Sequence, residues 1–338
     1  MTPHDTRVFI HPQFEPEYQR RPLVLVDVGA RGGLKSNWAA AKRHLRIFGF
    51  EPDKQEFERL TATASTSNAT EYFGVALHNQ TGTIRLNVAR DRGLSSLFEP
   101  NRAFLDSFPD AGRFDIVDRR EIAADTLDNL LASRSIKDVD FLKVDTQGSE
   151  RLILEGAAQS LASTVIGVEV EVEFAPIYTG QPLFADVDAF LRPLGFHLFD
   201  LRPCYWKRAA GRELGGPRGQ VIWADALYLK TLPALRDTVA RLEPADRVGK
   251  VLRALSVALL YGYDDYALEI ARDAPALAPA QRELIERELR GHSVTSSATT
   301  GFPGRRQIAG ALHRLWRIVR PRDKDAWSVS DADLGNFD

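Results

Sequence analysis

The sequence predicts an α/β protein with a doubly wound, mostly parallel sheet, followed by a C-terminal helical appendage. Three observations favour this class. Short apolar runs alternate with segments of helical periodicity between residues 22 and 231, as in sheets whose strands are covered on both faces. A glycine-rich turn, from Gly29 to Gly33, ends the first of these runs. From Leu232 to Leu289 no strand pattern is found, and apolar residues recur at helical spacing only.

The elements of the predicted sheet follow in chain order after an irregular lead-in, residues 1–21. Apolar or alternating runs predict strands, and periodic segments between them predict helices, with Asp53 capping one of them. The predicted strands are 23–28, 46–50, 70–77, 83–88, 116–124, 139–145, 165–174, 196–199 and 221–229. The predicted helices are 38–45, 53–64, 125–131, 152–157 and 183–194.

The C-terminal part of the chain divides into three predicted segments. Residues 232–292 predict the helical appendage, and residues 293–304, rich in Ser, Thr and Gly, predict a linker. Residues 305–338 predict a basic amphipathic helix and an acidic tail. In that helix, Ile308, Leu312, Leu315, Trp316 and Val319 share one face, while Arg306, Arg314, Arg317 and Arg320 lie mostly on the other. A solvated helix and a contact with a membrane surface or an anionic partner both remain open.

Composition narrows the functional classes. The net charge of −2 argues against an extended nucleic-acid-binding surface. Cys204 is the only cysteine, so the chain can form no internal disulfide, which suits a reducing cytoplasm. No apolar run is long enough to span a membrane, and the polar residues 1–19 lack a signal-peptide core. We expect a cytoplasmic protein, peripheral to a membrane if the basic helix binds one, and a homo-oligomer stays open.

A nucleotide-like ligand is predicted at the ends of the first two strands. The glycine turn permits close approach of backbone to a ligand, and Glu51 ends the second strand about 20 residues later. A carboxylate in this position accepts hydrogen bonds from ribose hydroxyls.

The 338 residues leave room for about two domains, at roughly 100–200 residues each.

Carboxylates also gather at two later strands. Asp145 ends the fourth core strand, before Thr146-Gln147-Gly148-Ser149-Glu150. The fifth strand carries Glu169, Glu171 and Glu173, which a period of two places on one face. Three such groups could hold a divalent cation, but no second ligand set is visible, and no metal is predicted.

Three local patterns resemble the FkbM-type family of S-adenosylmethionine-dependent methyltransferases. They are Val26 to Gly33 followed by Phe50-Glu51-Pro52, then Asp125-Thr126-Leu127-Asp128, and then Leu142 to Glu150 followed by Leu154-Glu155-Gly156-Ala157. The resemblance covers roughly residues 20–230 and implies a sheet of the class I methyltransferase type. One position departs from it, since Arg31 stands where the family often has Asn.

The resemblance, with the strand-end positions, implies a site for S-adenosylmethionine. The glycine turn would approach its methionine end, Asp27 would hold the ammonium, and Glu51 would accept the ribose hydroxyls. Ala76 and Leu77 would lie near the adenine, and Asp145 near the methyl group. The expected cofactor-binding residues are Asp27, Gly29, Ala30, Arg31, Gly33, Glu51, Pro52, Ala76, Leu77 and Asp145.

The resemblance also implies methyl transfer to a hydroxyl of a sugar, glycan or secondary metabolite. His78, at a strand end, is the first candidate for the base, because its ordinary pKa of about 6.5 suits neutral pH. Asp145, Glu169 and Glu171 are the rival catalytic candidates. The loops at 93–112 and 174–184 are the expected walls of the acceptor pocket.

Two other functions compete. The segment from Gly29 to Glu51 also fits an NAD-dependent oxidoreductase, although the turn is not Gly-x-Gly-x-x-Gly and no Tyr-x-x-x-Lys pair is present. A degenerate methyltransferase-like scaffold, acting only in protein interactions, is the third hypothesis. The joint presence of Asp27, Glu51 and Asp145 favours a working cofactor site.

Overall fold

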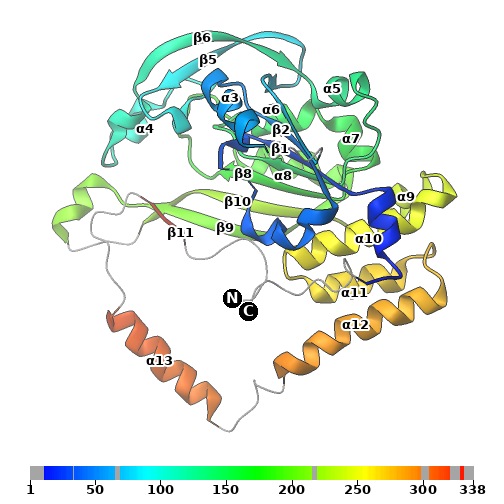
Figure 1. Ribbon diagram of the computed structural model, residues 1–338. Coiled ribbons are helices and arrows are strands. Elements are labelled where there is room, and N and C mark those ends of the chain that lie inside the picture. Colours follow the sequence, from blue (N-terminus) through cyan, green and yellow to red (C-terminus); the bar gives the residue numbers. More distant parts are fainter. Residues whose placement is uncertain are drawn as a thin grey trace.

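The computed structural model describes residues 11–32, 34–64, 69–214, 219–297, 304–319 and 328–330 (Figure 1). Gly33, the first ten residues, half of the predicted linker and the acidic tail lie outside this part. The main sheet has the order β11-β9-β10-β8-β7-β1-β2-β3. Its strands are β1 (Leu23–Val28), β2 (Leu45–Phe50), β3 (Thr70–Phe73), β7 (Phe141–Val144), β8 (Gly167–Glu173), β9 (Phe196–Trp206), β10 (Gln220–Lys230) and β11 (Ser328–Ser330).

The predicted doubly wound, mostly parallel sheet is confirmed. Strands β3, β2, β1, β7 and β8 are parallel, and β10, β9 and β11 continue the sheet in antiparallel pairs. The chain runs outward from β1 through β2 to β3 and then returns to β7 on the other side. This reversal makes a topological switch point at the carboxyl ends of β1 and β7, where open α/β sheets bind ligands.

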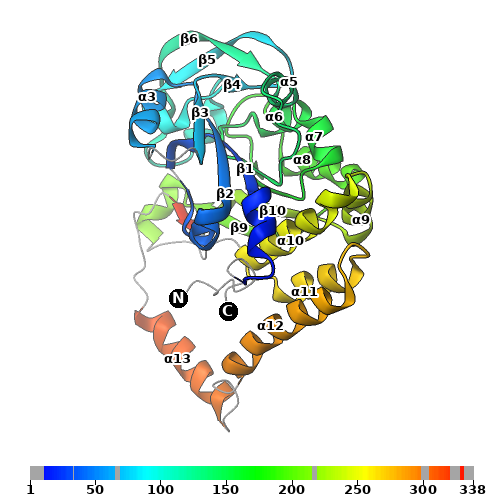
Figure 2. The ribbon, with the colours of Figure 1, turned by 45° about the vertical axis from the view of Figure 1, so that its right-hand side comes forward.

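One predicted strand is wrong. The segment 70–77 is not continuous, because the chain leaves the main sheet after β3 and β4 (Ala76–Leu77) pairs with another sheet. That sheet has the order β4-β6-β5, with β5 (Gly82–Ala89) antiparallel to β6 (Ile116–Asp125). Gly74 lies at the break, where a Cβ would stand 3.3 Å from the ring of Phe57. The small sheet arches over the carboxyl edge of the main sheet (Figure 2).

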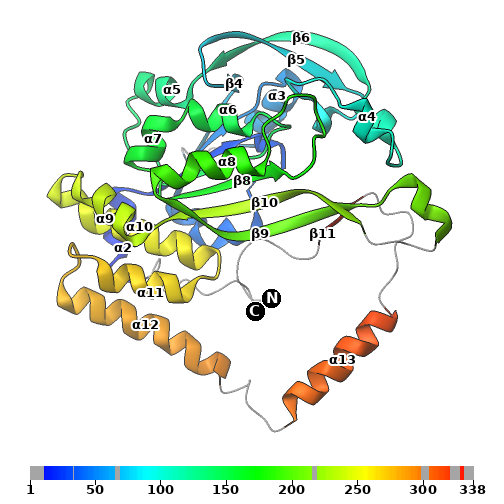
Figure 3. The ribbon, with the colours of Figure 1, turned by 180° about the vertical axis from the view of Figure 1, so that it is seen from behind.

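Helices cover both faces of the main sheet. The side chains of Val24, Val26 and Val28 pack into one core, with α5 to α8, and those of Leu23 and Leu25 into another. Figure 3 shows α6, α7 and α8 in front of the sheet. The helices on the first side are α5 (Leu127–Ser133), α6 (Glu150–Glu155), α7 (Ala158–Ser163) and α8 (Phe184–Leu191). Helix α3 (Lys54–Thr63) lies on the other side of the sheet (Figures 1 and 3), and α4 (Arg102–Leu105) lies near the small sheet.

The C-terminal helices share the second core with the sheet. Val251, Leu252 and Leu255 of α10 pack with Leu25 of β1 and Phe141 of β7. The elements of this side and beyond are α2 (Glu15–Arg20), η2 (Ser36–His44), α9 (Leu232–Ala240), α10 (Pro244–Leu260), α11 (Asp264–Asp273), α12 (Pro279–Ser297) and α13 (Arg305–Val319). Short 3₁₀ turns lie at Ala30–Gly32, Arg92–Leu94, Ala111–Phe114, Arg192–Leu194 and Ala209–Leu214.

Two predicted irregular segments contain helix instead. The lead-in, residues 1–21, includes α2, because Tyr18 is buried against α10 and its hydroxyl lies 2.6 Å from Ser256 Oγ. The predicted linker, residues 293–304, begins as the end of α12, since no Gly or Pro interrupts the helix between Gly291 and Ser297.

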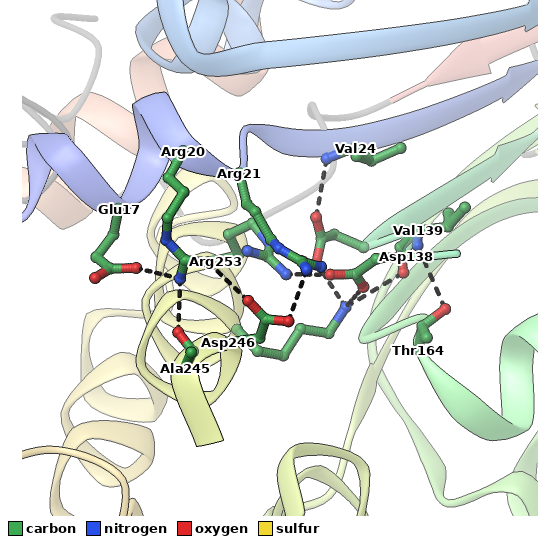
Figure 4. Close-up of polar contacts among 12 residues, drawn as sticks. Glu17, Arg20, Arg21, Val24, Asp138, Val139, Thr164, Ala245, Asp246 and Arg253 are labelled. Atoms are coloured by element: carbon green, nitrogen blue, oxygen red, sulfur yellow. Dashed lines mark hydrogen bonds and ion pairs between the residues drawn. The ribbon is translucent and has the colours of Figure 1, made fainter. Parts of the chain in front are cut away.

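A buried ionic cluster ties α10 to the amino end of β7 (Figure 4). Lys250 Nζ lies 2.7 Å from Asp140 Oδ1 and 2.6 Å from Asp138 Oδ1, and Arg253 Nε lies 2.9 Å from Asp140 Oδ1. The backbone N–H of Val24 donates to Asp140 Oδ2. Although burial opposes it, the charges of Arg253 and Lys250 hold the pKa of Asp140 below its usual value. Every carboxylate of this cluster therefore has a cationic partner.

Candidate functional site

A cavity of about 420 Å³ lies at the switch point of the sheet. Its size is within the range of about 300–1,000 Å³ that is typical of small-molecule sites. The carboxyl ends of β1, β2 and β7 form its floor, and the small sheet and the turn after β5 form its walls. The predicted site residues in its lining are Gly29, Arg31, Glu51, Pro52, Ala76, Leu77 and Asp145.

Gly29 brings three strand ends together. Its N–H donates to the carbonyl of Phe50, and its φ of +75° lies in the left-handed region that glycine adopts freely. A Cβ at this position would stand 1.9 Å from the carbonyl oxygen of Asp145. The backbone of β1 can therefore approach that of β7 only with glycine here. Ala30 is buried beside it and is not in the lining, while Gly33 lies outside the described residues.

Glu51 offers a carboxylate to the cavity. Its side chain is buried, and Oε1 accepts a hydrogen bond of 2.9 Å from the N–H of Asp53. Among the residues that the structure describes, the other oxygen accepts no hydrogen bond. Burial raises the pKa of Glu51, and the N–H of Asp53 and the charge of Arg31 oppose this change. A buried carboxylate with one free oxygen is suited to accept hydrogen bonds from ligand hydroxyls.

The small sheet gives the cavity an apolar wall. Ile84, Leu86 and Val88 of β5 line it at a period of two, together with Ile122 of β6. The sequence predicted a half-exposed strand here, but not that its apolar face would meet the ligand cavity. The alternation of apolar and polar residues along 83–88 predicted the strand. What its apolar face contacts depends on the tertiary structure and does not follow from the alternation.

Lys143 links Asp27 to Asp145. Its Nζ lies 3.0 Å from Asp27 Oδ1 and 3.5 Å from Asp145 Oδ2. Asp27 is buried in β1 and is not in the cavity lining. Burial raises its pKa, and Lys143 opposes this change. Asp145 is 40% exposed and lines the cavity. Sequence reasoning missed Lys143, although a cation inside an apolar strand was a visible sign.

Three carboxylates lie behind the cavity wall. Oxygens of Glu150, Glu171 and Glu173 all lie within 4.8 Å of one another. Burial raises the pKa of Glu150 to about 7, and it raises the pKa values of Glu171 and Glu173 well above their usual range. Mutual repulsion adds to the shifts. We assign no metal to this group.

Cavity-lining side chains connect this carboxylate group to the cavity. Gln147 Nε2 donates to Glu171 Oε1 at 3.1 Å, and the hydroxyl of Thr146 donates to Glu150 Oε1 at 2.7 Å. Glu171, a predicted candidate base, is thus one side chain removed from the cavity. Sequence reasoning noted Glu150 and Glu173 but did not bring them to this site, because their meeting depends on how α6 follows β7.

The two predicted acceptor loops meet beside Gln147. The hydroxyl of Tyr178 lies 2.9 Å from the carbonyl oxygen of Leu94 and 3.1 Å from Gln147 Oε1, and its one proton is shared between these two acceptors. Ser96 Oγ donates to the carbonyl of Gln147. Pro100 and Tyr178 form a β-bridge. The loops 93–112 and 174–184 are therefore held together at one side of the cavity.

His78 and Glu169 lie elsewhere. Glu169 forms an ion pair with Lys35 and accepts a hydrogen bond of 2.7 Å from Tyr261, which attaches β8 to the helical layer. His78 is half-buried, and its carbonyl oxygen would be 2.0 Å from a Cβ at Gly156. Burial lowers the pKa of His78. Neither side chain lines the cavity.

The groups that line the cavity fit S-adenosylmethionine. The turn at Gly29 leaves backbone room, Glu51 offers a carboxylate for the ribose, and the wall made by Leu77, Ile84 and Leu86 suits an apolar ring. Asp145 offers a negative charge that matches a sulfonium. The group would be held by residues from five different strands or strand ends.

Comparison with a protein-family model also indicates a methyltransferase. The family model described as "Methyltransferase FkbM domain" matches residues 27–198. No curated protein matches the sequence. A solved FkbM methyltransferase from Methylobacillus flagellatus KT is 16% identical with a TM-score of 0.34. That match covers 62% of this chain, which spans only 43% of the solved chain.

Two further solved methyltransferases are similar at the same level. Magnesium protoporphyrin IX methyltransferase from Synechocystis PCC 6803 is 8% identical with a TM-score of 0.30, over 67% of this chain and 82% of that one. A SAM-dependent methyltransferase from Anabaena variabilis ATCC 29413 is 10% identical with a TM-score of 0.32, over 67% and 84%. The family match covers half of the chain and shows a methyltransferase domain, for which S-adenosylmethionine is the cofactor. The chain belongs to the FkbM methyltransferase-domain family.

Proposed function

We propose that the protein transfers a methyl group from S-adenosylmethionine to a hydroxyl of a sugar, glycan or secondary metabolite. One observation carries the proposal, namely that Gly29, Glu51 and Asp145 line one cavity at the switch point of the sheet. The acceptor is a small molecule or a glycan chain that enters beside the loop 93–112, of which Gly93, Ser95, Ser96 and Leu97 line the cavity.

The cofactor supplies an electrophilic methyl group on a sulfonium when bound. Glu51 would accept hydrogen bonds from its ribose hydroxyls, and the turn at Gly29 would receive the methionine end. The apolar wall from Ile84 to Val88 would pack against the adenine and exclude water. The carboxylate of Asp145, which lines the same cavity, would then be available to the reacting groups.

Asp145 then orients the acceptor hydroxyl and accepts its proton as the oxygen–carbon bond forms and the carbon–sulfur bond breaks. Lys143, 3.5 Å away, holds this carboxylate in position. Such a displacement depends on alignment, so most of the rate enhancement comes from holding the two reactants in line. Glu171, linked through Gln147, is the second candidate to receive the proton.

The direct test is methyl transfer from labelled S-adenosylmethionine to a panel of sugars and hydroxylated metabolites. We expect label on an ether oxygen of at least one acceptor, and loss of that product in Asp145→Asn. Methylation of nitrogen or carbon only would overturn the assignment to a hydroxyl. Binding of the cofactor without any transfer across the panel would favour a scaffold function.

A further inference from the structure

Helix α13 stands apart from the rest of the molecule. Figures 1 to 3 show it separated from the main sheet and from α9 to α12. Its apolar side chains are exposed, with Ile308 at 50%, Leu312 at 60% and Leu315 at 56%. Of the large hydrophobic side chains that are exposed in the described residues, only Val117 lies outside this helix. An apolar face of this extent is typical of a binding surface.

The apolar face is continuous along the helix. At 3.6 residues per turn, Ile308, Leu312, Leu315 and Trp316 fall within an arc of about 100°. The ring of His313 stacks on that of Trp316, with 5.7 Å between centroids. The face therefore runs for most of the length of Arg305–Val319.

The charge of the same segment is strongly positive. Residues 305–322 contain six arginines and no acidic residue, although the whole chain has a net charge of −2. The side chains of Arg305 and Arg314 are exposed. The partner must therefore carry negative charge and also have an apolar region in which the apolar side chains of α13 can be buried. Nucleic acid would bind the arginines through its phosphates but would not bury the apolar face.

We propose that α13 docks on the surface of an anionic lipid membrane and lies in the interface plane. Basic amphipathic helices with Trp and Leu on one face bind there by combining apolar burial with attraction to anionic headgroups. The helix is too short to cross, since its 15 residues extend about 22 Å against a hydrocarbon core of about 30 Å. Among the described residues, no helix is long and apolar enough to span a membrane.

The orientation keeps the methyl-transfer cavity accessible. The small sheet and the cavity lie at one end of the molecule, and α13 lies at the other (Figure 1). Docking through α13 would thus place the enzyme near a membrane and leave its active site open to water. The proposal is independent of the acceptor that the enzyme uses.

Vesicle co-sedimentation of the full chain tests this proposal. The vesicles are phosphatidylcholine alone or phosphatidylcholine with phosphatidylglycerol. We expect binding to the anionic vesicles, little to the neutral ones, and weakening as salt is raised. Leu312→Ser with Leu315→Ser should reduce partitioning roughly tenfold or more. Arg305→Gln with Arg314→Gln should reduce it by roughly thirtyfold on the anionic vesicles alone, since each arginine near the surface contributes about 1 kcal/mol.

Matched controls come from elsewhere on the surface. Val117→Ser removes another exposed apolar side chain, and Arg290→Gln removes another exposed cation, 66% exposed on α12. Both should leave partitioning unchanged. Circular dichroism should show that all variants keep the fold, because α13 stands apart from the sheet.

Three results would overturn the proposal. One is an absence of binding to either vesicle. Another is binding that the α13 variants leave unchanged. The third is a mass by light scattering that doubles in wild type and returns to the monomer in the leucine variant, which would show that a second copy covers the helix.

Discussion

The two ends of β7 carry acidic groups of similar composition in opposite electrostatic settings. At the amino end, Asp138 and Asp140 are paired with Lys250 and Arg253. At the carboxyl end, Glu150, Glu171 and Glu173 gather with no cation among the ion pairs described. The pKa of Asp140 is lowered, and the pKa values of the three glutamates are raised.

This difference separates stability from function. Paired buried charges hold elements together, and here they attach α10 to the sheet. Unpaired buried carboxylates cost stability, so they persist where they serve a ligand or a proton transfer. The end that is electrostatically costly is the end with the cavity. Substitutions at the two ends should therefore affect different measurable properties.

The largest effect is expected from Asp140→Ala. This change leaves Lys250 and Arg253 buried with one carboxylate between them, and loss of one partner from a buried pair costs about 3–5 kcal/mol. The free energy of unfolding in urea measures this cost. A loss below about 1 kcal/mol would show that the cluster does not hold α10 in place.

Asp145→Asn, the matched change at the other end, should act on turnover. We expect kcat to fall roughly 10²-fold or more, as for loss of a group that accepts a proton. Stability should change by less than about 1 kcal/mol, because Asp145 is 40% exposed. If stability fell as much as in Asp140→Ala, the two ends would not differ in kind.

Glu51→Ala should weaken binding of S-adenosylhomocysteine about tenfold or more, because a charged acceptor for the ribose hydroxyls is lost. Calorimetric titration measures the change, and the melting temperature provides the control for folding. An unchanged affinity would remove Glu51 from the cofactor site.

The two ends should also differ in their response to pH. Asp140, with a lowered pKa, contributes stability that is present above its unfolded pKa of about 3.9 and is lost as pH falls through the folded value. Glu150, with a raised pKa, contributes stability that is present below its unfolded pKa of about 4.3 and is lost as pH rises through about 7.

Glu150→Gln should therefore become more stable relative to wild type as pH rises from about 4.3 to about 7. The neutral amide keeps an oxygen for the hydroxyl of Thr146 and for the N–H of Gly148. Unfolding in urea at several pH values measures the difference. A stability difference that stays constant across this range would contradict a raised pKa.

The smallest effect is expected from removal of residues 302–338. Affinity for S-adenosylhomocysteine should stay within about twofold of wild type, since neither α13 nor β11 lines the cavity. A large loss would place the C-terminal segment at the cofactor site.

Local patterns in the sequence were enough to predict most strands of the main sheet. The apolar runs of β1, β7 and β8 and the cap at Asp53, which accepts from the N–H of Glu56, needed only periodicity and residue type. The predictions for the lead-in and for the segment 70–77 were wrong. Helix α2 depends on the contact of Tyr18 with α10, and β4 depends on its pairing with β6. Contacts between distant segments decide both.

The candidate site divides in the same way. Glu51 and Asp145 end strands, so strand prediction alone brings them to one edge of the sheet. Glu169 and Glu171 share a strand face but have different partners. Glu169 contacts Lys35 and Tyr261, whereas Glu171 contacts Gln147. Alternation along a strand cannot distinguish them, because the distinction comes from the helices and loops that pack on each position.

The most direct test of the central claim is calorimetric titration of the full chain with S-adenosylhomocysteine, with NAD in a parallel cell. The site described here predicts micromolar binding of S-adenosylhomocysteine, weakened by Glu51→Ala, and no binding of NAD. Binding of NAD alone, or S-adenosylhomocysteine binding that Glu51→Ala leaves unchanged, would contradict it.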